Sequence, residues 1–142
     1  MIKLEHANIC VTDIDAMIKF LKIVCPEFVI RKDDSSLAGH RWVHIGTDAT
    51  YIALQESLPD SKPSWIPYLG VPGINHLAYE VDNVDSIRER LIKAGYKEST
   101  VPNKHPYRKR IYFYDPEGND WEFIQYLSDD PKKRHDYDTP DK

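Results

Sequence analysis

Hydrophobic and polar positions first alternate along the chain and then recur at helical spacing. Residues 2–12 alternate loosely and are rich in strand-forming side chains, which predicts a strand. Residues 14–24 place apolar side chains three and four positions apart, which is typical of an amphipathic helix. Asp13 is the expected N-cap of this helix, and Pro26 marks its expected end. The chain is therefore predicted to begin with a strand and a helix.

Shorter alternating stretches follow the helix. Phe28–Arg31 predicts a short strand, and Asp33–Gly39 predicts a polar turn. Arg41–Ile45 and Thr50–Gln55 alternate with a period of two on either side of a Gly-containing turn, which indicates a hairpin. The first part of the chain is therefore predicted to form a βαβββ unit.

The same order of elements returns in the second half. Ile74–Val81 predicts a strand, and residues 84–94 predict a helix that Gly95 ends. The further predicted strands are Tyr96–Ser99, Arg110–Tyr114 and Asp120–Tyr126.

The sequence itself repeats along with the pattern. His76 follows His6 by 70 positions, and three more identical or similar pairs have the same offset. Arg41–Leu54 runs parallel to Arg110–Phe123 at an offset of 69, a difference that one inserted residue in a loop would explain. We therefore interpret the chain as an internal duplication.

The duplication predicts the domain organisation. Residues 1–56 and 74–127 form the two βαβββ units, and residues 57–73, with four prolines, form a linker. The charged residues 128–142 lack periodicity and are expected to form a mobile polar tail. Units of this size need a shared core, so the two units are expected to pack on each other in an α+β fold.

Composition and charge exclude some classes of function. The 142 residues carry a formal net charge of −4, which argues against a general nucleic-acid-binding protein. No apolar stretch is long enough to span a bilayer and no secretory signal is evident, so we expect a cytoplasmic protein without a membrane partner. Cys10 and Cys25 lack metal-site spacing and are expected to be free thiols.

Three residues could hold a metal ion. His6 and His76 lie on the first strand of each predicted unit, and Glu122 lies on the last strand of the second unit. Two neutral imidazoles and one carboxylate leave half of an octahedron open, an arrangement that suits Fe(II) and also serves Mn, Ni or Zn. His6, His76 and Glu122 are therefore the predicted metal ligands.

The repeated order of elements and three motifs resemble the vicinal oxygen chelate superfamily, which includes glyoxalases, bleomycin resistance proteins and extradiol dioxygenases. The motifs are HANICVTDID at residues 6–15, HLAYEVDNVD at residues 76–85 and YDPEGNDWEF at residues 114–123. The resemblance covers residues 3–127. It implies a cup-shaped mixed sheet with the helices outside, metal ligands at His6, His76 and Glu122, and a small-molecule substrate whose vicinal oxygens bind the metal.

The sequence departs from the superfamily at the fourth ligand position. Aligning the two units places Ala53 opposite Glu122, and a methyl group cannot bind a metal. Gln55 lies two residues further along the same strand face, so whether it completes the site stays open. The resemblance to glyoxalase I, which has a fourth ligand that acts as a base, is weakened accordingly.

The resemblance to extradiol dioxygenases is also incomplete. Tyr112 matches an active-site tyrosine of those enzymes and is a candidate catalytic residue. Their acid–base histidine is not matched, because Thr50 and Tyr51 occupy its position. His40 and His44 are expected to be structural or exposed.

Three functions therefore remain in view. The first is a metal-dependent enzyme of the dioxygenase or lyase type, and the second is a metal-free protein that sequesters a drug, as bleomycin resistance proteins do. The third is glyoxalase I. A homodimer is possible in each case. Lys104–Arg110 could attract an anionic substrate but suits a solvated loop better, and Trp65 and Tyr68 could cover the site or pack on the sheet.

Overall fold

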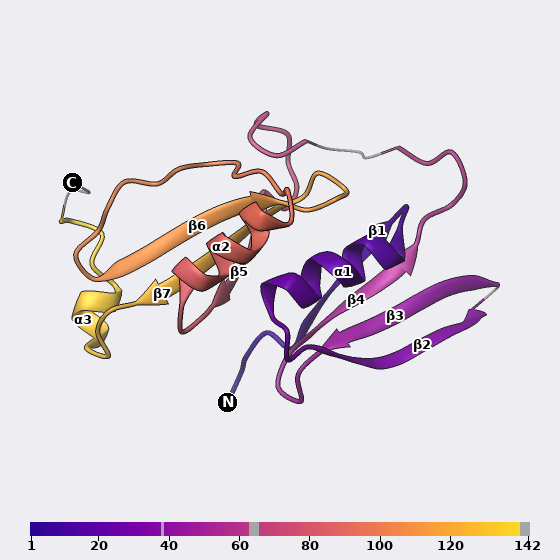
Figure 1. Cartoon of the computed structure of the whole chain (residues 1–142), viewed down its shortest axis with the longest axis horizontal. Helices are drawn as coiled ribbons and strands as arrows, with labels where there is room; N and C mark the ends of the chain where they lie inside the picture. The colour runs from indigo at the N-terminus through magenta and orange to yellow at the C-terminus, as the bar shows by residue number, and fades with distance from the viewer. Residues whose placement is uncertain (38, 63–65, 140–142) are drawn as a thin grey trace. The chain divides into compact units, whose positions relative to one another are not determined.

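The computed structural model describes residues 1–37, 39–62 and 66–139. The chain divides into two compact units, Met1–Ser64 (unit 1) and Trp65–Lys142 (unit 2). The elements are coloured by residue number in Figure 1. In chain order they are β1 (His6–Val11), α1 (Ile14–Val24), β2 (Val29–Leu37), β3 (His40–Gly46), β4 (Tyr51–Glu56), β5 (His76–Glu80), α2 (Val84–Lys93), β6 (Arg108–Tyr114), β7 (Asp120–Tyr126) and α3 (Pro131–Arg134).

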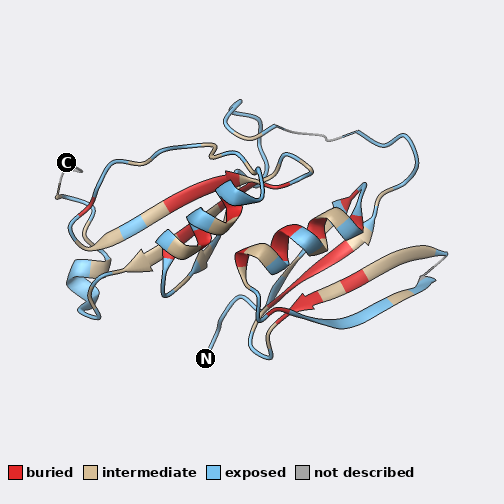
Figure 2. Cartoon of the chain, in the orientation of Figure 1, coloured by how far each residue is buried: buried red, intermediate tan, exposed pale blue. Residues whose placement is uncertain are grey.

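Unit 1 is a four-stranded sheet with one helix on it. The strand order is β1-β4-β3-β2, in which β1 and β4 are parallel and the other neighbours antiparallel. Asp13 caps α1 as predicted, because its side chain accepts a hydrogen bond from the Ala16 amide at 2.9 Å. The helix α1 packs against β3 and β4, and Figure 2 shows buried residues in red on the helix and on both strands. The other face of the sheet carries His6 and the residues in register with it.

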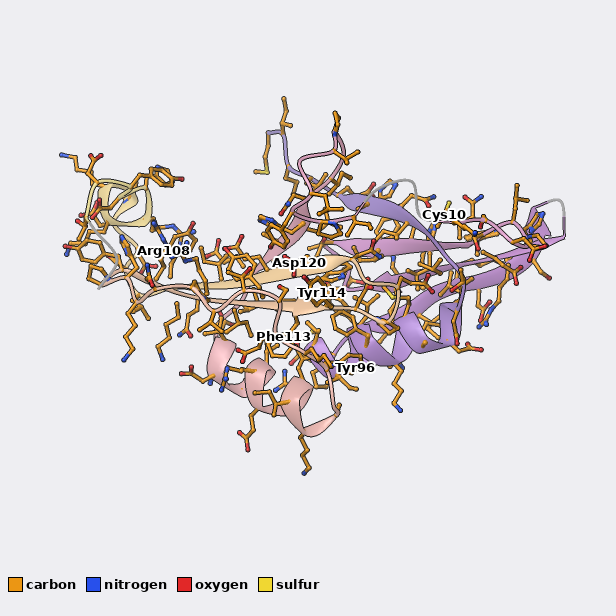
Figure 3. The ribbon with its side chains drawn as sticks, turned by 90° about the horizontal axis from the view of Figure 1, so that it is seen from above. Cys10, Tyr96, Arg108, Phe113, Tyr114 and Asp120 are labelled. Atoms are coloured by element: carbon orange, nitrogen blue, oxygen red, sulfur yellow. The ribbon has the colours of Figure 1, made fainter. Side chains whose placement is uncertain are left out.

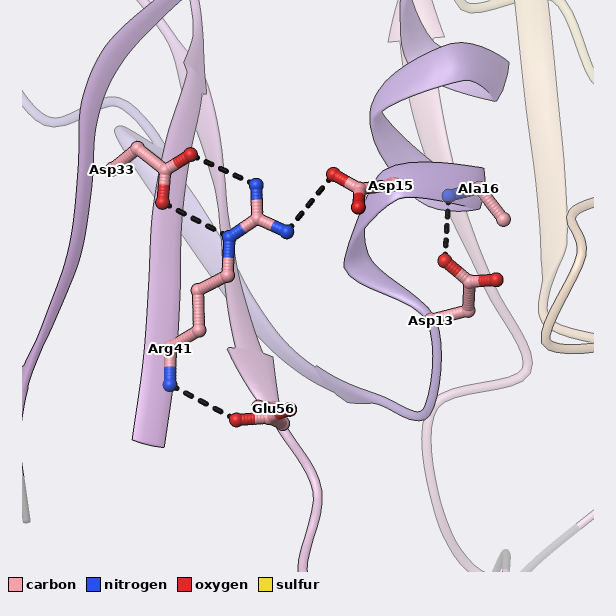
Figure 4. A network of polar contacts seen from close by, with 6 residues as sticks. All are labelled: Asp13, Asp15, Ala16, Asp33, Arg41 and Glu56. Atoms are coloured by element: carbon pink, nitrogen blue, oxygen red, sulfur yellow. Dashed lines mark hydrogen bonds and ion pairs between the residues drawn. The ribbon is translucent and has the colours of Figure 1, made fainter. Parts of the chain in front are cut away.

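The predicted turn at Asp33–Gly39 is wrong in its extent, because β2 continues to Leu37. Acidic residues are tolerated in this edge strand because a cation neutralises them. The Arg41 guanidinium donates to both Asp33 oxygens at 3.0 and 2.8 Å and to Asp15 at 2.9 Å, which ties β2 and β3 to the first turn of α1 (Figure 4). Arg41 lowers the pKa of Asp33. The turn itself is short and contains Gly39, whose φ is +81°.

Unit 2 has a three-stranded sheet in the order β5-β7-β6, with β5 and β7 parallel. Phe113, labelled in Figure 3, is fully buried, and α2 packs against β6 and β7. The predicted strand at Tyr96–Ser99 is reduced to one bridge, between Glu98 and Phe113, although the Ser99 amide also donates to the Tyr112 carbonyl at 3.1 Å. The second unit therefore repeats the first with its third element shortened.

Two segments outside the sheet of unit 2 pack on it. Tyr68, from the proline-rich stretch, donates a hydrogen bond to Asp120, which is buried at the start of β7 (Figure 3). Trp65 lies outside the described residues. The segment predicted as a polar tail contains α3, where Arg134 pairs with Glu80 at 2.8 Å and lies 3.8 Å from the centre of the Tyr126 ring.

The α+β prediction, with a repeated strand–helix–strand order, is confirmed. The observed division between residues 64 and 65 falls inside the stretch predicted as a linker. No helix in the described residues has the length and apolar character needed to cross a membrane.

Candidate metal site

The face of the unit 2 sheet that points away from α2 brings three of the predicted site residues together. Glu122 lies in the central strand β7, directly opposite Tyr112 in β6. His76 begins β5, and its Nε2 lies 3.1 Å from a Glu122 carboxylate oxygen. The His76 ring stands edge-on to the Tyr112 ring with centroids 5.7 Å apart. The alternation of side chains along paired strands places all three on one face.

The orientation of the His76 ring leaves one nitrogen available. Its Nδ1 lies 2.8 Å from the side-chain oxygen of Asn75, which accepts the Nδ1 proton. A neutral imidazole that donates from Nδ1 has a lone pair on Nε2, and this nitrogen faces the Glu122 carboxylate. Two acceptors at this distance need a shared proton or a cation between them.

The spacing of these two atoms suits a metal ion. Nitrogen and carboxylate ligands bind divalent transition metals at roughly 2.0 to 2.2 Å, so two neighbouring octahedral ligands lie about 3 Å apart. The observed separation of 3.1 Å between His76 Nε2 and Glu122 Oε2 agrees with this. His76 and Glu122 retain 33% and 13% of their side-chain exposure, so the pair is open to an ion.

Tyr112 supports the carboxylate. Its hydroxyl hydrogen-bonds to Glu122, and burial together with this negatively charged partner raises the pKa of Tyr112 above its usual value. Tyr112 therefore stays protonated at neutral pH and acts as a donor. It is positioned to hold one Glu122 oxygen in place or to donate to a bound molecule.

The corresponding histidine of unit 1 is held in a similar way. His6 Nδ1 lies 3.0 Å from a Glu5 carboxylate oxygen, which again leaves Nε2 as the free nitrogen. The His6 ring stacks on Tyr51, with centroids 4.6 Å apart and an angle of 13° between the planes. Both predicted imidazole ligands therefore use the preceding residue to fix the ring and present the same nitrogen.

The structure brings His76, Glu122 and Tyr112 together, whereas His6 belongs to unit 1. Within residues 1–37, 39–62 and 66–139, no three His, Cys, Asp or Glu side chains form a ready-made metal cluster. The pair in unit 2 is thus the part of the predicted site whose geometry is described directly.

At the fourth ligand position the register of the strands agrees with the sequence alignment, which placed Ala53 opposite Glu122. Ala53 is 3% exposed and lies between Asn8 of β1 and His44 of β3, whereas Glu122 lies between Ala78 of β5 and Tyr112 of β6. Ala53 therefore takes the place of Glu122 in the first sheet, and His44 takes the place of Tyr112. Gln55 lies one row further, in register with Cys10 and Trp42.

Sequence reasoning missed His44 because of the turn between the paired strands. Four residues, 47–50, separate Gly46 from its partner Tyr51, and five residues, 115–119, separate Tyr114 from its partner Asp120. The constant offset of 69 therefore matched His44 with buried Phe113 instead of Tyr112. Aligning β3 with β6 by the distance of each residue from the following turn would have paired His44 with Tyr112.

A second group that the sequence did not reveal surrounds Tyr51. The His44 ring lies 4.7 Å from the Tyr51 ring, and the Arg31 guanidinium lies 4.3 Å from the same ring centre. Burial lowers the pKa of His44, and the charges of His6 and Arg31 lower it further, so His44 is neutral at pH 7. His40, at the start of β3, makes none of these contacts among the described residues.

The chain matches the family model described as the glyoxalase, bleomycin resistance protein and dioxygenase superfamily over residues 3–123. No curated protein sequence matches it significantly.

Solved structures share the fold at low sequence identity. A fosfomycin resistance protein, FosX, from Mesorhizobium loti is 23% identical with a TM-score of 0.66, over 87% of this chain and 91% of that one. FosX from Listeria monocytogenes, solved with Mn(II) and sulfate, is 20% identical with a TM-score of 0.65, over 94% and 98%. A glyoxalase, bleomycin resistance protein and dioxygenase domain from Frankia is 20% identical with a TM-score of 0.71, over 96% and 99%.

Proposed function

Because the chain belongs to the glyoxalase, bleomycin resistance protein and dioxygenase superfamily, we propose that it is a divalent-metal-dependent enzyme acting on a small molecule with two neighbouring oxygen atoms. His6, His76 and Glu122 are the proposed protein ligands. The observation that carries the proposal is the 3.1 Å approach of His76 Nε2 to the Glu122 carboxylate. A histidine nitrogen and a carboxylate oxygen at this distance are spaced as two ligands of one metal ion would be.

The residues that hold the histidines support the same conclusion. Asn75 and Glu5 each accept the Nδ1 proton of the histidine that follows, at 2.8 and 3.0 Å. Ligand histidines in metal sites commonly donate their other ring proton to an oxygen, which fixes the tautomer and the ring orientation. The repetition of this contact in both units is expected if both rings serve one purpose. FosX from Listeria monocytogenes, which shares the fold, was solved with Mn(II).

The chemistry follows from the donor set. A divalent ion held by two imidazoles and one carboxylate supplies Lewis-acid stabilisation of negative charge on substrate oxygens. The chain's own groups hold the ligands in place: Tyr112 donates to Glu122, and Asn75 fixes the orientation of the His76 ring through Nδ1. Tyr112 remains protonated, so it can also donate a hydrogen bond to a substrate oxygen.

The experiment is a metal titration of chelator-treated protein with Mn²⁺, followed by calorimetry and elemental analysis. We expect one ion per chain. His76→Ala should weaken binding more than about 100-fold, because loss of even an outer partner of a metal ligand costs 10- to 100-fold. Tyr112→Phe should weaken it less, because only a partner of Glu122 is lost.

The matched control is His135→Ala, which removes an exposed imidazole of the C-terminal segment from the same unit. This variant should bind Mn²⁺ as the unaltered protein does. If the unaltered protein binds no divalent ion but binds an aromatic drug such as bleomycin tightly, the metal-dependent proposal is wrong and sequestration replaces it.

A further inference from the structure

Arg31 is the extra residue of a β-bulge. Ile30 pairs with Ile45 and Lys32 pairs with His44, so β2 advances by two residues where β3 advances by one. Ile45 is buried on the α1 side of the sheet, and His44 lies on the opposite side. The bulge turns Arg31 toward the His44 side, where its guanidinium lies over Tyr51. Bulges commonly redirect a side chain in this way beside functional sites.

Arg31 is held in position but has no carboxylate partner. Within the described ranges, none of the residues forms a hydrogen bond or ion pair with it, whereas Arg41, Arg88 and Arg134 each pair with an acidic side chain. The stacking contact at 4.3 Å uses the face of the guanidinium and leaves its N–H edges free. A fixed, exposed guanidinium with free N–H groups is suited to an anion.

The surroundings of Arg31 are aromatic and keep it close to a proposed metal ligand. Tyr51 contacts Arg31 and stacks on His6 at 4.6 Å, so one ring connects the two. The His44 ring lies against the Tyr51 ring. The centroids of the Trp42 and His44 rings are 4.9 Å apart, and both side chains lie on the same face of β3. The ring nitrogens of His44 have no hydrogen-bond partner among the described residues, so they too are open to a ligand.

We propose that Arg31, His44 and Trp42 form a subsite of unit 1 for the anionic end of the substrate, a carboxylate or phosphonate attached to a planar group. Arg31 binds the anion through its N–H edge, and the rings of His44 and Trp42 contact the planar part. The proposal rests on the proposed function in assigning this anion to the substrate, since His6 shares Tyr51 with Arg31. It requires no metal for the anion to bind.

The test uses metal-free protein at low salt, because screening weakens exposed charge contacts. Benzoate and phenylphosphonate are the probes, and benzamide is the neutral ligand of matched shape. Binding is followed by NMR at the Arg31 side-chain N–H and the His44 ring. We expect both anions to shift these signals and benzamide to leave them unchanged.

Substitutions separate charge from fold. Arg31→Gln should weaken benzoate binding about tenfold or more, the effect of one charge-assisted contact. Arg31→Lys should lie between, because it keeps the charge without the planar fork. Lys32→Gln is the matched control, since the neighbouring Lys32 already pairs with Asp34 at 3.2 Å, and it should change binding less than about twofold.

Equal binding of benzamide and benzoate, equal effects of Arg31→Gln and Lys32→Gln, or no shift of the Arg31 signal by either anion would each overturn the subsite. These results are independent of the Mn²⁺ titration. If the anion binds and Mn²⁺ does not, the metal-dependent function fails and the anion site stands. If Mn²⁺ binds and the anion does not, only the assigned substrate class is lost.

Discussion

Residues that lie in register across neighbouring strands form a row, and the equivalent row differs in chemistry between the two sheets. In unit 2 the row is Ala78, Glu122 and Tyr112, and in unit 1 it is Asn8, Ala53 and His44. Unit 2 thus offers a carboxylate that accepts a hydrogen bond from a phenol and lies 3.1 Å from an imidazole nitrogen. Unit 1 offers a buried methyl group beside a neutral histidine. The two units share backbone positions, while the side chains that point away from the helix differ in kind and in their contacts.

The difference between the two rows bears on the proposed metal site. A carboxylate that is 13% exposed beside an imidazole lone pair gains from a cation. Ala53 creates no such demand, and the charges near it are the guanidinium of Arg31 and the Glu5 carboxylate that His6 holds. The proposed metal ligands His76 and Glu122 lie in unit 2, and the proposed ligand His6 and the proposed anion subsite lie in unit 1.

Changing the row of unit 1 to resemble that of unit 2 should have the largest effect on stability. Ala53→Glu places the missing carboxylate at a position that is 3% exposed, next to His44. We expect the metal-free protein to lose about 2 to 4 kcal/mol of unfolding free energy, because an unpaired buried charge is costly. Urea denaturation measures the loss.

Ala53→Gln is the control for this substitution, because it adds nearly the same volume without a charge. The two variants should differ, with Ala53→Glu the less stable. Equal losses would mean that packing alone disfavours a larger side chain at position 53 and that charge does not distinguish the rows.

The two hairpin turns offer a smaller comparison. Asp115 accepts hydrogen bonds from the Trp121 indole at 2.9 Å and from the amides of Glu117 and Asn119 at 2.8 and 3.0 Å. In unit 1 the Thr47 hydroxyl accepts from the Ala49 and Thr50 amides at 3.2 and 3.4 Å. Asp115→Ala should cost about 1 to 3 kcal/mol, since it leaves a buried indole donor without its acceptor, and Thr47→Ala about 0.5 to 1 kcal/mol.

Thermal denaturation of both variants checks this order. Asp115→Asn keeps the size of the side chain but turns an acceptor into a donor, so it should also destabilise the protein. Burial raises the pKa of Asp115, because it disfavours the charged carboxylate. A stable Asp115→Asn variant would show that removing this buried charge outweighs the lost hydrogen bonds.

The smallest expected effect is the pH dependence of the Arg41 contacts of unit 1. Arg41 lowers the pKa of Asp33 below its usual value of 3.8, so the folded state binds this proton more weakly than the unfolded state does. The stabilisation is present above pH 3.8 and is lost as the pH falls through the lower, folded-state pKa. Asp33→Asn should therefore reduce the melting temperature slightly at neutral pH and not at all near pH 2.

A melting difference between Asp33→Asn and the unaltered protein that stays constant from pH 7 to pH 2 would contradict this account. Asp82→Asn is a suitable control, because Asp82 is exposed in unit 2.

The fold could be predicted because it follows from local patterns. The helix beginning after Asp13 and the strand Asp120–Tyr126 were predicted within a residue, since a cap and a period of two mark them. The extension of β2 through Asp33 could not be predicted, because its carboxylates depend on Arg41, which arrives from the next strand. Long-range neutralisation leaves no local signal.

The sequence predicted the three proposed ligands but not the residues around them. His76 and Glu122 stood out because the duplication repeats the first and the strand pattern places the second. Arg31 and His44 did not, because a bulge directs one and a turn of different length shifts the alignment of the other. Both are backbone irregularities of one residue, which periodicity cannot detect.

The central proposal is that His6 and His76 bind the same metal ion. Pulsed electron paramagnetic resonance of bound Cu²⁺ tests this proposal most directly. The method counts coordinated histidines by detecting the ring nitrogen of each that is remote from the ion. Cu²⁺ binds nitrogen and oxygen sites tightly and can replace the native ion. We predict two imidazoles in the unaltered protein and one in each of His6→Ala and His76→Ala. A single imidazole in the unaltered protein, or two after His6→Ala, would contradict the account.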